Sequence, residues 1–143
     1  MRILNNRKLI PLLSFLIFAP LALANHHSVA NIEWHEWSDT AFKRAEAEDK
    51  LVLLDIGAAW CQFCKKMEQV TYQDPEVVKI INEHYIAVKA DIETTEAVRK
   101  LYESFGVPGT IVLTPNREEI NKRRGYIEPL QMQWHLLGVL QDA

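Results

Sequence analysis

The stretch Ala59-Trp60-Cys61-Gln62-Phe63-Cys64-Lys65 indicates both the fold and the chemistry of this chain. It contains the two cysteines of the sequence, which are three positions apart. A continuous apolar run at 51–56 precedes it, and a stretch with helical character at about 64–70 follows it. A Cys-x-x-Cys pair at a turn from a buried strand into a helix predicts a redox-active dithiol.

The spacing of the two cysteines explains how such a dithiol would work. Residues i and i+3 share a face of a helix, so the sulfurs of Cys61 and Cys64 can close a small disulfide ring. Cys61 would lie where unpaired N–H groups and the helix dipole stabilise a thiolate. We therefore expect a lowered pKa that makes Cys61 the nucleophile, while Cys64 resolves the mixed disulfide with a substrate.

Other roles for the cysteine pair stay open at this point. A structural disulfide that closes so short a loop would stabilise the fold only weakly. A zinc site would need four ligands, and the sequence has neither a second Cys-x-x-Cys nor a His-x-x-x-His pattern. Two thiolates could still carry Cu(I), and His26 and His27 near a processed amino terminus could bind Cu(II) or Ni(II). A binding or chaperone domain that makes little use of its disulfide is a further alternative.

The first 24 residues have the pattern of a secretory signal peptide. Three basic residues precede an apolar stretch at 9–23, and Ala22-Leu23-Ala24 forms a cleavage site. The stretch is short for a membrane span and is interrupted by two prolines, although an uncleaved anchor is the alternative. Cleavage after Ala24 predicts a periplasmic or secreted protein without a stable membrane anchor, in a compartment where disulfides persist.

The composition is that of one globular domain with a core. The chain has 143 residues, 48% of them hydrophobic, and carries 16 basic and 19 acidic residues. Removal of 1–24 leaves 13 basic residues against 19 acidic ones, a formal charge of −6. An acidic domain without a basic stripe argues against nucleic acid as a partner. We assign 25–37 to an N-terminal segment and 38–143 to the domain.

Hydrophobic periodicity predicts an α/β domain. We expect helices over 38–48, over about 64–70, from Pro75, from Thr94 or Thr95, and from Pro129. Strands are expected at 51–56, 85–91, 111–113 and 118–124, and a segment at 32–37 either pairs briefly or packs over the core. The two βα units predict parallel pairing, and the last hairpin adds antiparallel strands.

Two of these helices have apolar residues that predict which side faces the core. For the helix from Thr94 or Thr95, the predicted stripe is Ala97, Leu101 and Phe105, beside Val98 and Tyr102. For the helix from Pro129, the predicted core side is Leu130, Trp134, Leu137 and Leu140.

Asp55 is the exception in the apolar run at 51–56, six positions before Cys61. A buried carboxyl group there would have a raised pKa and could exchange protons with Cys64. The alternative is a strand-end aspartate that bonds to the backbone. Lys89, in the strand predicted at 85–91, could reach Asp55 or could be a surface lysine.

These residues resemble those of the thioredoxin superfamily over about 32–141. The run Trp60-Cys61-x-x-Cys64-Lys65 is similar to its active-site motif, and Asp55 and Lys89 occupy the places of its buried aspartate and neighbouring lysine. The part up to Asp91 resembles the thioredoxin-like domains of YyaL and spermatogenesis-associated type proteins, and the C-terminal domain of DsbD-type transmembrane reductases. The resemblance implies a thioredoxin fold, with a mixed sheet flanked by helices.

The resemblance also implies a cis-proline loop that faces the dithiol and holds the substrate strand. In this chain the segment is Val107-Pro108-Gly109-Thr110, which lacks the usual Pro-Thr pair. Pro108 is therefore either the cis-proline of a shortened loop or a trans proline after loss of the cis position. Together with Trp60, we expect Val107 and Pro108 to shape a mostly apolar docking surface.

The predicted function is that of an exported thiol–disulfide oxidoreductase. Reduction potentials in this superfamily range from about −270 to about −120 mV. Asp55 and the absence of histidine between the cysteines favour the reducing half of that range. We expect protein disulfides as substrates, a membrane thiol relay as the source of electrons, and no organic cofactor. The alternatives are a Cu(I)-handling module and a non-catalytic binding or chaperone domain.

Overall fold

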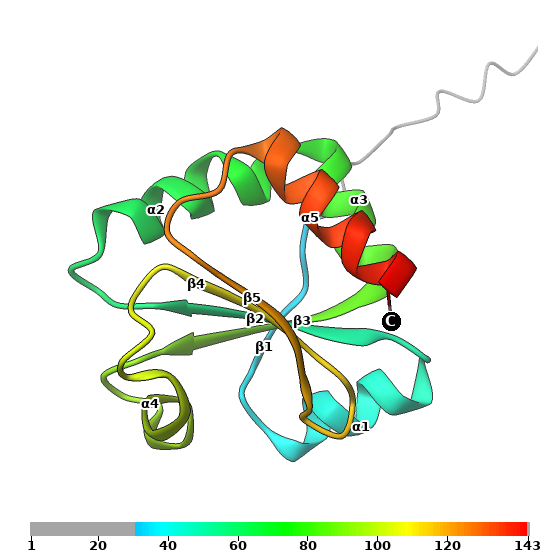
Figure 1. Ribbon diagram of the computed structural model, residues 1–143, viewed down its shortest axis with the longest axis horizontal. Coiled ribbons are helices and arrows are strands. Elements are labelled where there is room, and N and C mark those ends of the chain that lie inside the picture. The colour runs from blue at the N-terminus through cyan, green and yellow to red at the C-terminus, as the bar shows by residue number, and fades with distance from the viewer. Residues whose placement is uncertain (1–30, 143) are drawn as a thin grey trace, which may run out of the picture.

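The computed structural model describes residues 31–142. The predicted signal peptide and the two histidines His26 and His27 lie outside the described residues. The described part of the chain forms an α/β fold with one five-stranded mixed sheet, in the order β1-β3-β2-β4-β5. Helices α2, α3 and α5 cover one face of the sheet, and α1 and α4 cover the other (Figure 1).

The elements closely follow the predicted order. They are β1 (Trp34–Glu36), α1 (Asp39–Ala47), β2 (Leu51–Gly57), α2 (Gln62–Gln69), the 3-10 helix η1 (Thr71–Gln73), α3 (Pro75–His84), β3 (Tyr85–Asp91), α4 (Glu96–Tyr102), β4 (Gly109–Leu113), β5 (Glu119–Arg124) and α5 (Pro129–Asp142). The start signals of two helices are confirmed, since Ser38 caps α1 and Asp74 caps α3 with Pro75 at its first turn.

Strand β2 lies in the middle of the sheet and positions the site. It pairs in parallel with β3 and antiparallel with β4, and its residues 52–56 are buried. Coverage by helices on both faces explains why this strand is continuously apolar. Alternation along the strand points Leu53 and Asp55 to the face covered by α2, α3 and α5.

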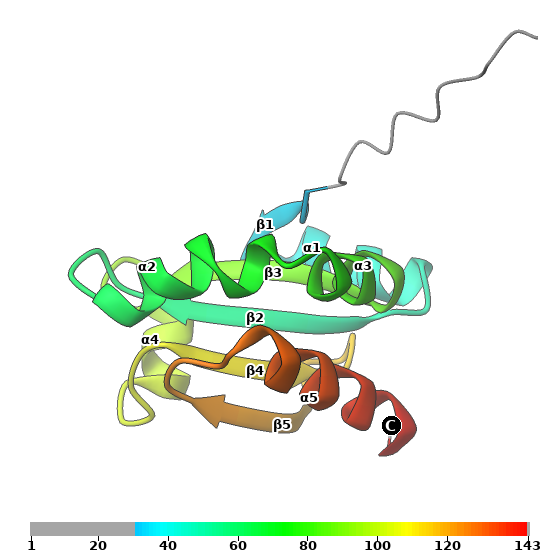
Figure 2. The ribbon, with the colours of Figure 1, turned by 90° about the horizontal axis from the view of Figure 1, so that it is seen from above.

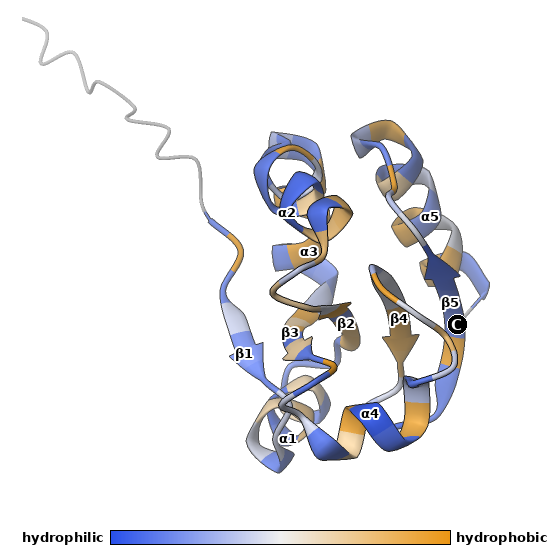
Figure 3. Ribbon diagram, turned by 90° about the vertical axis from the view of Figure 1, so that its left-hand side faces the viewer, coloured by the Kyte–Doolittle hydropathy of each residue, from blue (hydrophilic) through white to orange (hydrophobic). Residues whose placement is uncertain are grey.

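The outer strands differ from this core. The segment at 34–36 is β1, which pairs in parallel with β3 and so extends the sheet to one edge. At the other edge of the sheet formed by the described residues lies β5, which pairs with β4 (Figure 2). Figure 3 shows apolar residues in β2 and β4 and hydrophilic ones in β5. A charged edge strand resists pairing with other chains. None of the helices in the described part of the chain is long and apolar enough to span a membrane.

The predicted core side of α5 is mostly wrong. Its buried side chains are Met132, Leu136 and Val139, whereas Trp134 is 65% exposed, and Leu130 and Leu137 are exposed as well. Of the predicted set, Leu140 alone packs against the core, partly buried. Both sets have the spacing of one helix face, so periodicity alone fits either of them. Ile127, buried in the same cluster just before the helix, joins Met132 and Leu136 against the sheet and so fixes the rotation of α5.

The predicted stripe of α4 is also partly wrong. Val98 and Tyr102 are buried, but Ala97 and Leu101 face solvent and Phe105 is only partly buried. The helix has only seven residues and lies on the face of the sheet that α1 also covers (Figure 1). Val98 and Tyr102, four positions apart, share one side of this short helix and are its buried side chains.

Candidate functional site

Cys61 and Cys64 form a disulfide at the start of α2. Cys61 is the N-cap of the helix, and the backbone N–H of Cys64 donates a hydrogen bond to its Sγ atom over 3.1 Å. A turn closed by the Cys61 N–H and the Ala58 carbonyl, 3.0 Å apart, joins the end of β2 to this cap. The same N–H donor and the helix dipole would stabilise a Cys61 thiolate once the disulfide is reduced.

The disulfide lies at the end of the sheet that faces the viewer in Figure 3. Cys61 is 4% exposed and Cys64 is 8% exposed, and both pack with Ala58 in a small cluster. Trp60 and Phe63, which directly precede Cys61 and Cys64 in the sequence, are largely exposed. The sulfurs are thus shielded, and the solvent-exposed surface around them includes two aromatic rings.

The loop before β4 closes the other side of the disulfide. Val107 packs against the cysteine cluster, and the Val107–Pro108 peptide bond is cis. Of the two alternatives that the sequence left open for Pro108, the structure has the cis-proline in a shortened loop. The carbonyl of Pro108 accepts a hydrogen bond of 2.8 Å from the N–H of Gly125, which fixes this loop to the end of β5.

Asp55 is buried on the α2 side of β2, with 4% of its surface exposed. The hydroxyl of Tyr72 donates a hydrogen bond of 3.0 Å to its Oδ1 atom. Burial raises the pKa of Asp55 to about 6, and the Tyr72 hydrogen bond and the charge of Lys89 oppose this rise. The carboxyl group therefore changes its ionisation state near neutral pH, as a proton-transfer group would need to.

Lys89 lies opposite Asp55 in the register of β2 and β3, but its ammonium group pairs with the carboxylate of Glu68 on α2. It also lies 5.6 Å from the ring centre of Trp34. Both partners of the ion pair are more than one third exposed, so the pair adds little stability. Sequence reasoning missed Glu68, although its place four residues after Cys64 indicates that the two share a helix face.

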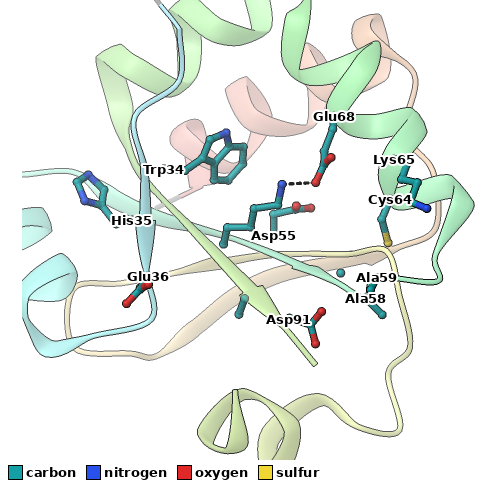
Figure 4. Close-up of a pocket in the computed structure, with 13 residues that line it drawn as sticks. Trp34, His35, Glu36, Asp55, Ala58, Ala59, Cys64, Lys65, Glu68 and Asp91 are labelled. Atoms are coloured by element: carbon teal, nitrogen blue, oxygen red, sulfur yellow. Dashed lines mark hydrogen bonds and ion pairs between the residues drawn. The ribbon is translucent and has the colours of Figure 1, made fainter. Parts of the chain in front are cut away.

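A cavity of about 480 Å³ joins these groups. Figure 4 shows Asp55 and Glu68 at the middle of this space, Trp34 on one side and the Cys64 sulfur on the other. A space of this size that is lined in part by charged side chains has room for water. Water in it would connect Asp55 with Cys64 and could carry a proton between them. Its lining is Trp34, His35, Glu36, Asp55, Gly57, Ala58, Ala59, Cys64, Lys65, Glu68, Lys89, Ala90 and Asp91.

The metal alternative gains no third ligand from the described residues. Within 31–142, no group of three or more His, Cys, Asp or Glu side chains is arranged to hold a metal ion. The candidate copper ligands His26 and His27 lie outside the described residues.

The fold and the site have clear counterparts among known proteins. A thioredoxin from Thermus thermophilus is similar in structure, with a TM-score of 0.67 and 20% identity over 78% of this chain and 88% of that one. The oxidised C-terminal domain of DsbD from Neisseria meningitidis has a TM-score of 0.53 and 33% identity, over 68% of this chain and 85% of that one. The first similarity shows the fold alone.

Human spermatogenesis-associated protein 20 is 32% identical over 98 residues, which are 63% of this chain. The matched part spans only 12% of that relative's length. A family model named Thioredox_DsbH, described as "Protein of unknown function, DUF255", matches residues 16–135. The chain therefore belongs to this thioredoxin-like DsbH family.

Proposed function

We propose that this protein is a thiol–disulfide oxidoreductase that reduces protein disulfides with the Cys61–Cys64 pair. The observation that carries the proposal is the position of the disulfide at the N-cap of α2, where the Cys64 N–H is bonded to the Cys61 sulfur. A purely structural disulfide would gain nothing from a donor that stabilises a thiolate.

The reaction begins with the reduced protein. The Cys61 thiolate attacks one sulfur of a substrate disulfide, forms a mixed disulfide and releases the other substrate sulfur as a thiolate that takes up a proton. Cys64 then loses its proton and attacks the Cys61 sulfur. This step forms the Cys61–Cys64 disulfide and releases the second substrate sulfur as a thiolate, which takes up a proton from the solvent. Two electrons have then passed from the dithiol to the substrate, and the proton of Cys64 has left the site.

Asp55 is proposed to accept the proton from Cys64 in the second step. The two residues line one cavity, and the pKa of Asp55 is raised to about 6. Above that pH the carboxylate can act as a base, and below it the carboxyl group is already protonated. Trp60, Val107 and Pro108 are proposed to hold the substrate, since Val107 packs against the cysteine cluster, Pro108 follows Val107 in the same loop, and the exposed Trp60 directly precedes Cys61.

Repeated turnover requires a supply of electrons to reduce the Cys61–Cys64 disulfide. We propose a membrane thiol relay as the donor. A relative described as "Thiol:disulfide interchange protein DsbD" from Neisseria meningitidis is 34% identical over 93 residues, which supports a place in such a chain of thiol exchanges.

Export is proposed from the sequence pattern of residues 1–24. Expression of the full chain with a C-terminal tag in a Gram-negative host, followed by fractionation and amino-terminal sequencing, tests it. We expect a periplasmic protein that begins at Asn25. A membrane-bound product that retains residues 1–24 would show an uncleaved anchor instead.

The proposed activity is tested with the reduced protein and a disulfide-bonded substrate such as insulin. We expect substrate thiols to appear as Cys61 and Cys64 reoxidise, and the Cys64→Ser variant to accumulate a mixed disulfide through Cys61. Stoichiometric Cu(I) binding that needs both cysteines, without reductase activity, would favour the metal-handling alternative. Wild-type function in the Cys61→Ser, Cys64→Ser double variant would favour the binding or chaperone domain.

A further inference from the structure

Three polar side chains are buried at the dithiol end of the sheet, on three different elements. Asp55 lies on β2, Thr110 is its register partner on β4, and Tyr72 belongs to η1, which follows α2. The Thr110 hydroxyl makes no hydrogen bond within the described part of the chain. The hydroxyl of Tyr72 is the side-chain donor that the structure places on Asp55, at 3.0 Å.

The ring of Tyr72 is held in place from several sides. It is 3% exposed, and it packs edge-on against Trp34 with 4.9 Å between ring centres. The neighbouring Thr71 hydroxyl donates a bond of 2.6 Å to the carbonyl of Ile127, which ties η1 to the segment before α5. A ring fixed in this way presents its hydroxyl to Asp55 without a further loss of side-chain freedom.

We propose that Tyr72 is a positioning residue that holds the Asp55 carboxylate in its ionised form, in place to accept the proton of Cys64. This inference rests on the proposed function, in which Asp55 is the proton acceptor. It explains why a phenol stands in a cluster of mostly apolar side chains. Phenylalanine would fill the same space but would leave the buried carboxylate without this donor.

The other charges around Asp55 do not replace this hydrogen bond. Lys89 from β3 favours the ionised carboxylate, and Glu68 from α2 opposes it. Because these two side chains pair with each other, their effects on Asp55 partly cancel. Cys64 on the α2 wall is neutral in the disulfide. The other titratable side chains that line the cavity are Lys65 from α2, His35 and Glu36 from β1, and Asp91 from β3. Burial and the charge of Asp55 keep the pKa of Tyr72 well above its ordinary value, so the phenol stays a donor throughout the working pH range.

The direct test is the titration of Asp55 by carbon NMR in the oxidised protein, in the wild type and in Tyr72→Phe. We expect the apparent pKa of Asp55 to rise by about one pH unit in the variant, because the charged form loses a hydrogen bond. The matched control is Tyr85→Phe, which removes a buried hydroxyl bonded at 2.7 Å to the Leu136 carbonyl. That variant should leave the Asp55 titration unchanged. An unchanged Asp55 pKa in Tyr72→Phe would overturn the proposal.

The kinetic test follows the same shift in activity. The acid limb of the pH–rate profile for insulin reduction should move upward by about one pH unit in Tyr72→Phe. When Asp55 is already replaced by asparagine, the Tyr72→Phe change should not alter the pH–rate profile further. A merely structural effect of Tyr72→Phe would appear both with Asp55 and with asparagine at this position. If the wild type reduces no disulfide, the proposed function fails, and the NMR titration still decides whether Tyr72 holds Asp55.

A measurement without a variant covers the case in which Tyr72→Phe fails to fold. In the wild type, the ring carbon that bears the Tyr72 hydroxyl should shift with the pKa of Asp55, because its proton is shared with that carboxylate. The equivalent carbon of Tyr85 should show no such transition. A Tyr72 resonance that stays constant through the Asp55 titration would contradict the proposal.

Discussion

The two ends of strand β2 bury polar groups in different ways. At the end that begins with Leu51, the hydroxyl of Tyr85 donates to the carbonyl of Leu136, which joins β3 to α5. At the end that leads to the cysteines, the hydroxyl of Tyr72 donates to the carboxyl group of Asp55. One tyrosine satisfies a backbone group that never changes charge, and the other satisfies a group that ionises near pH 6.

The two ends of β2 therefore have different roles: the Tyr85 end contributes to the stability of the fold, and the Asp55 end contributes to the chemistry of the dithiol. Substitutions at the Tyr85 end should change the free energy of unfolding and leave thiol chemistry alone. Substitutions at the Asp55 end should change reactivity, or stability in a pH-dependent way. A protein with one uniform core would not show this division.

Replacement of Cys61 by serine should have the largest effect. Loss of the attacking thiolate should lower the rate of disulfide reduction by at least about a thousandfold. Insulin reduction measured with matched amounts of folded protein gives the comparison, and circular dichroism gives the control for folding. Residual activity within tenfold of the wild type would remove Cys61 from the mechanism.

The Leu136→Ala variant tests the opposite end. Leu136 is fully buried between α5 and the sheet, so its truncation should cost about 4 kcal/mol in the free energy of unfolding. The matched control is Leu137→Ala at the neighbouring, exposed position. This change should lower the free energy of unfolding by well under about 1 kcal/mol. Urea denaturation measures both. A larger loss for Leu137→Ala than for Leu136→Ala would mean that α5 is rotated as periodicity predicted.

The Asp55→Asn variant should show the pH-dependent effect. The pKa of Asp55 is raised from 3.8 to about 6 in the fold, so its protonated form favours folding below about pH 4. This contribution is lost as the pH rises through 6, and the ionised carboxylate then costs about 3 kcal/mol. The variant, which cannot ionise and still accepts from Tyr72, should be more stable than the wild type by about that amount at pH 8.

Near pH 4 the two proteins should have similar free energies of unfolding. Urea denaturation at pH 4, 6 and 8 follows the change. A stability difference that stays constant over this range would show that Asp55 is not titrating within the fold.

The smallest effect is expected for Tyr85→Phe. Loss of one neutral hydrogen bond to a backbone carbonyl should lower the free energy of unfolding by about 1 kcal/mol, equally at pH 6 and pH 8. Thermal denaturation at the two pH values measures it. A pH-dependent loss would mean that the Tyr85 end is coupled to a titrating group and would weaken the contrast between the two ends.

The dithiol end could be predicted from sequence because its signals are local. The cysteine spacing, the apolar run before it and the Asp74-Pro75 start of α3 each act within a few residues, and the structure has the disulfide, β2 and α3 where they were expected. The thioredoxin resemblance then supplied the mixed sheet flanked by helices around them. The sequence left the isomer of Pro108 undecided because the segment at 107–111 fits both a shortened loop with a cis-proline and a loop with a trans proline.

The parts that could not be predicted depend on contacts between distant elements. The rotation of α5 is decided by what its faces meet, because two of its faces are apolar. The bond between Tyr72 and Asp55 and the pair of Lys89 with Glu68 depend on how α2 and η1 lie over the sheet. A tyrosine after the active-site helix has no periodicity or spacing that marks it as a partner of a residue 17 positions earlier.

The central claim is that the Cys61–Cys64 pair works as a reducing dithiol, and its reduction potential tests this most directly. The protein is equilibrated in glutathione and dithiothreitol redox buffers, and the reduced fraction is measured by thiol labelling. The account predicts a potential near about −250 mV or lower, which would make the protein a disulfide reductase that needs an electron donor. A value near about −130 mV would make it a disulfide donor and would contradict the proposed direction of electron flow.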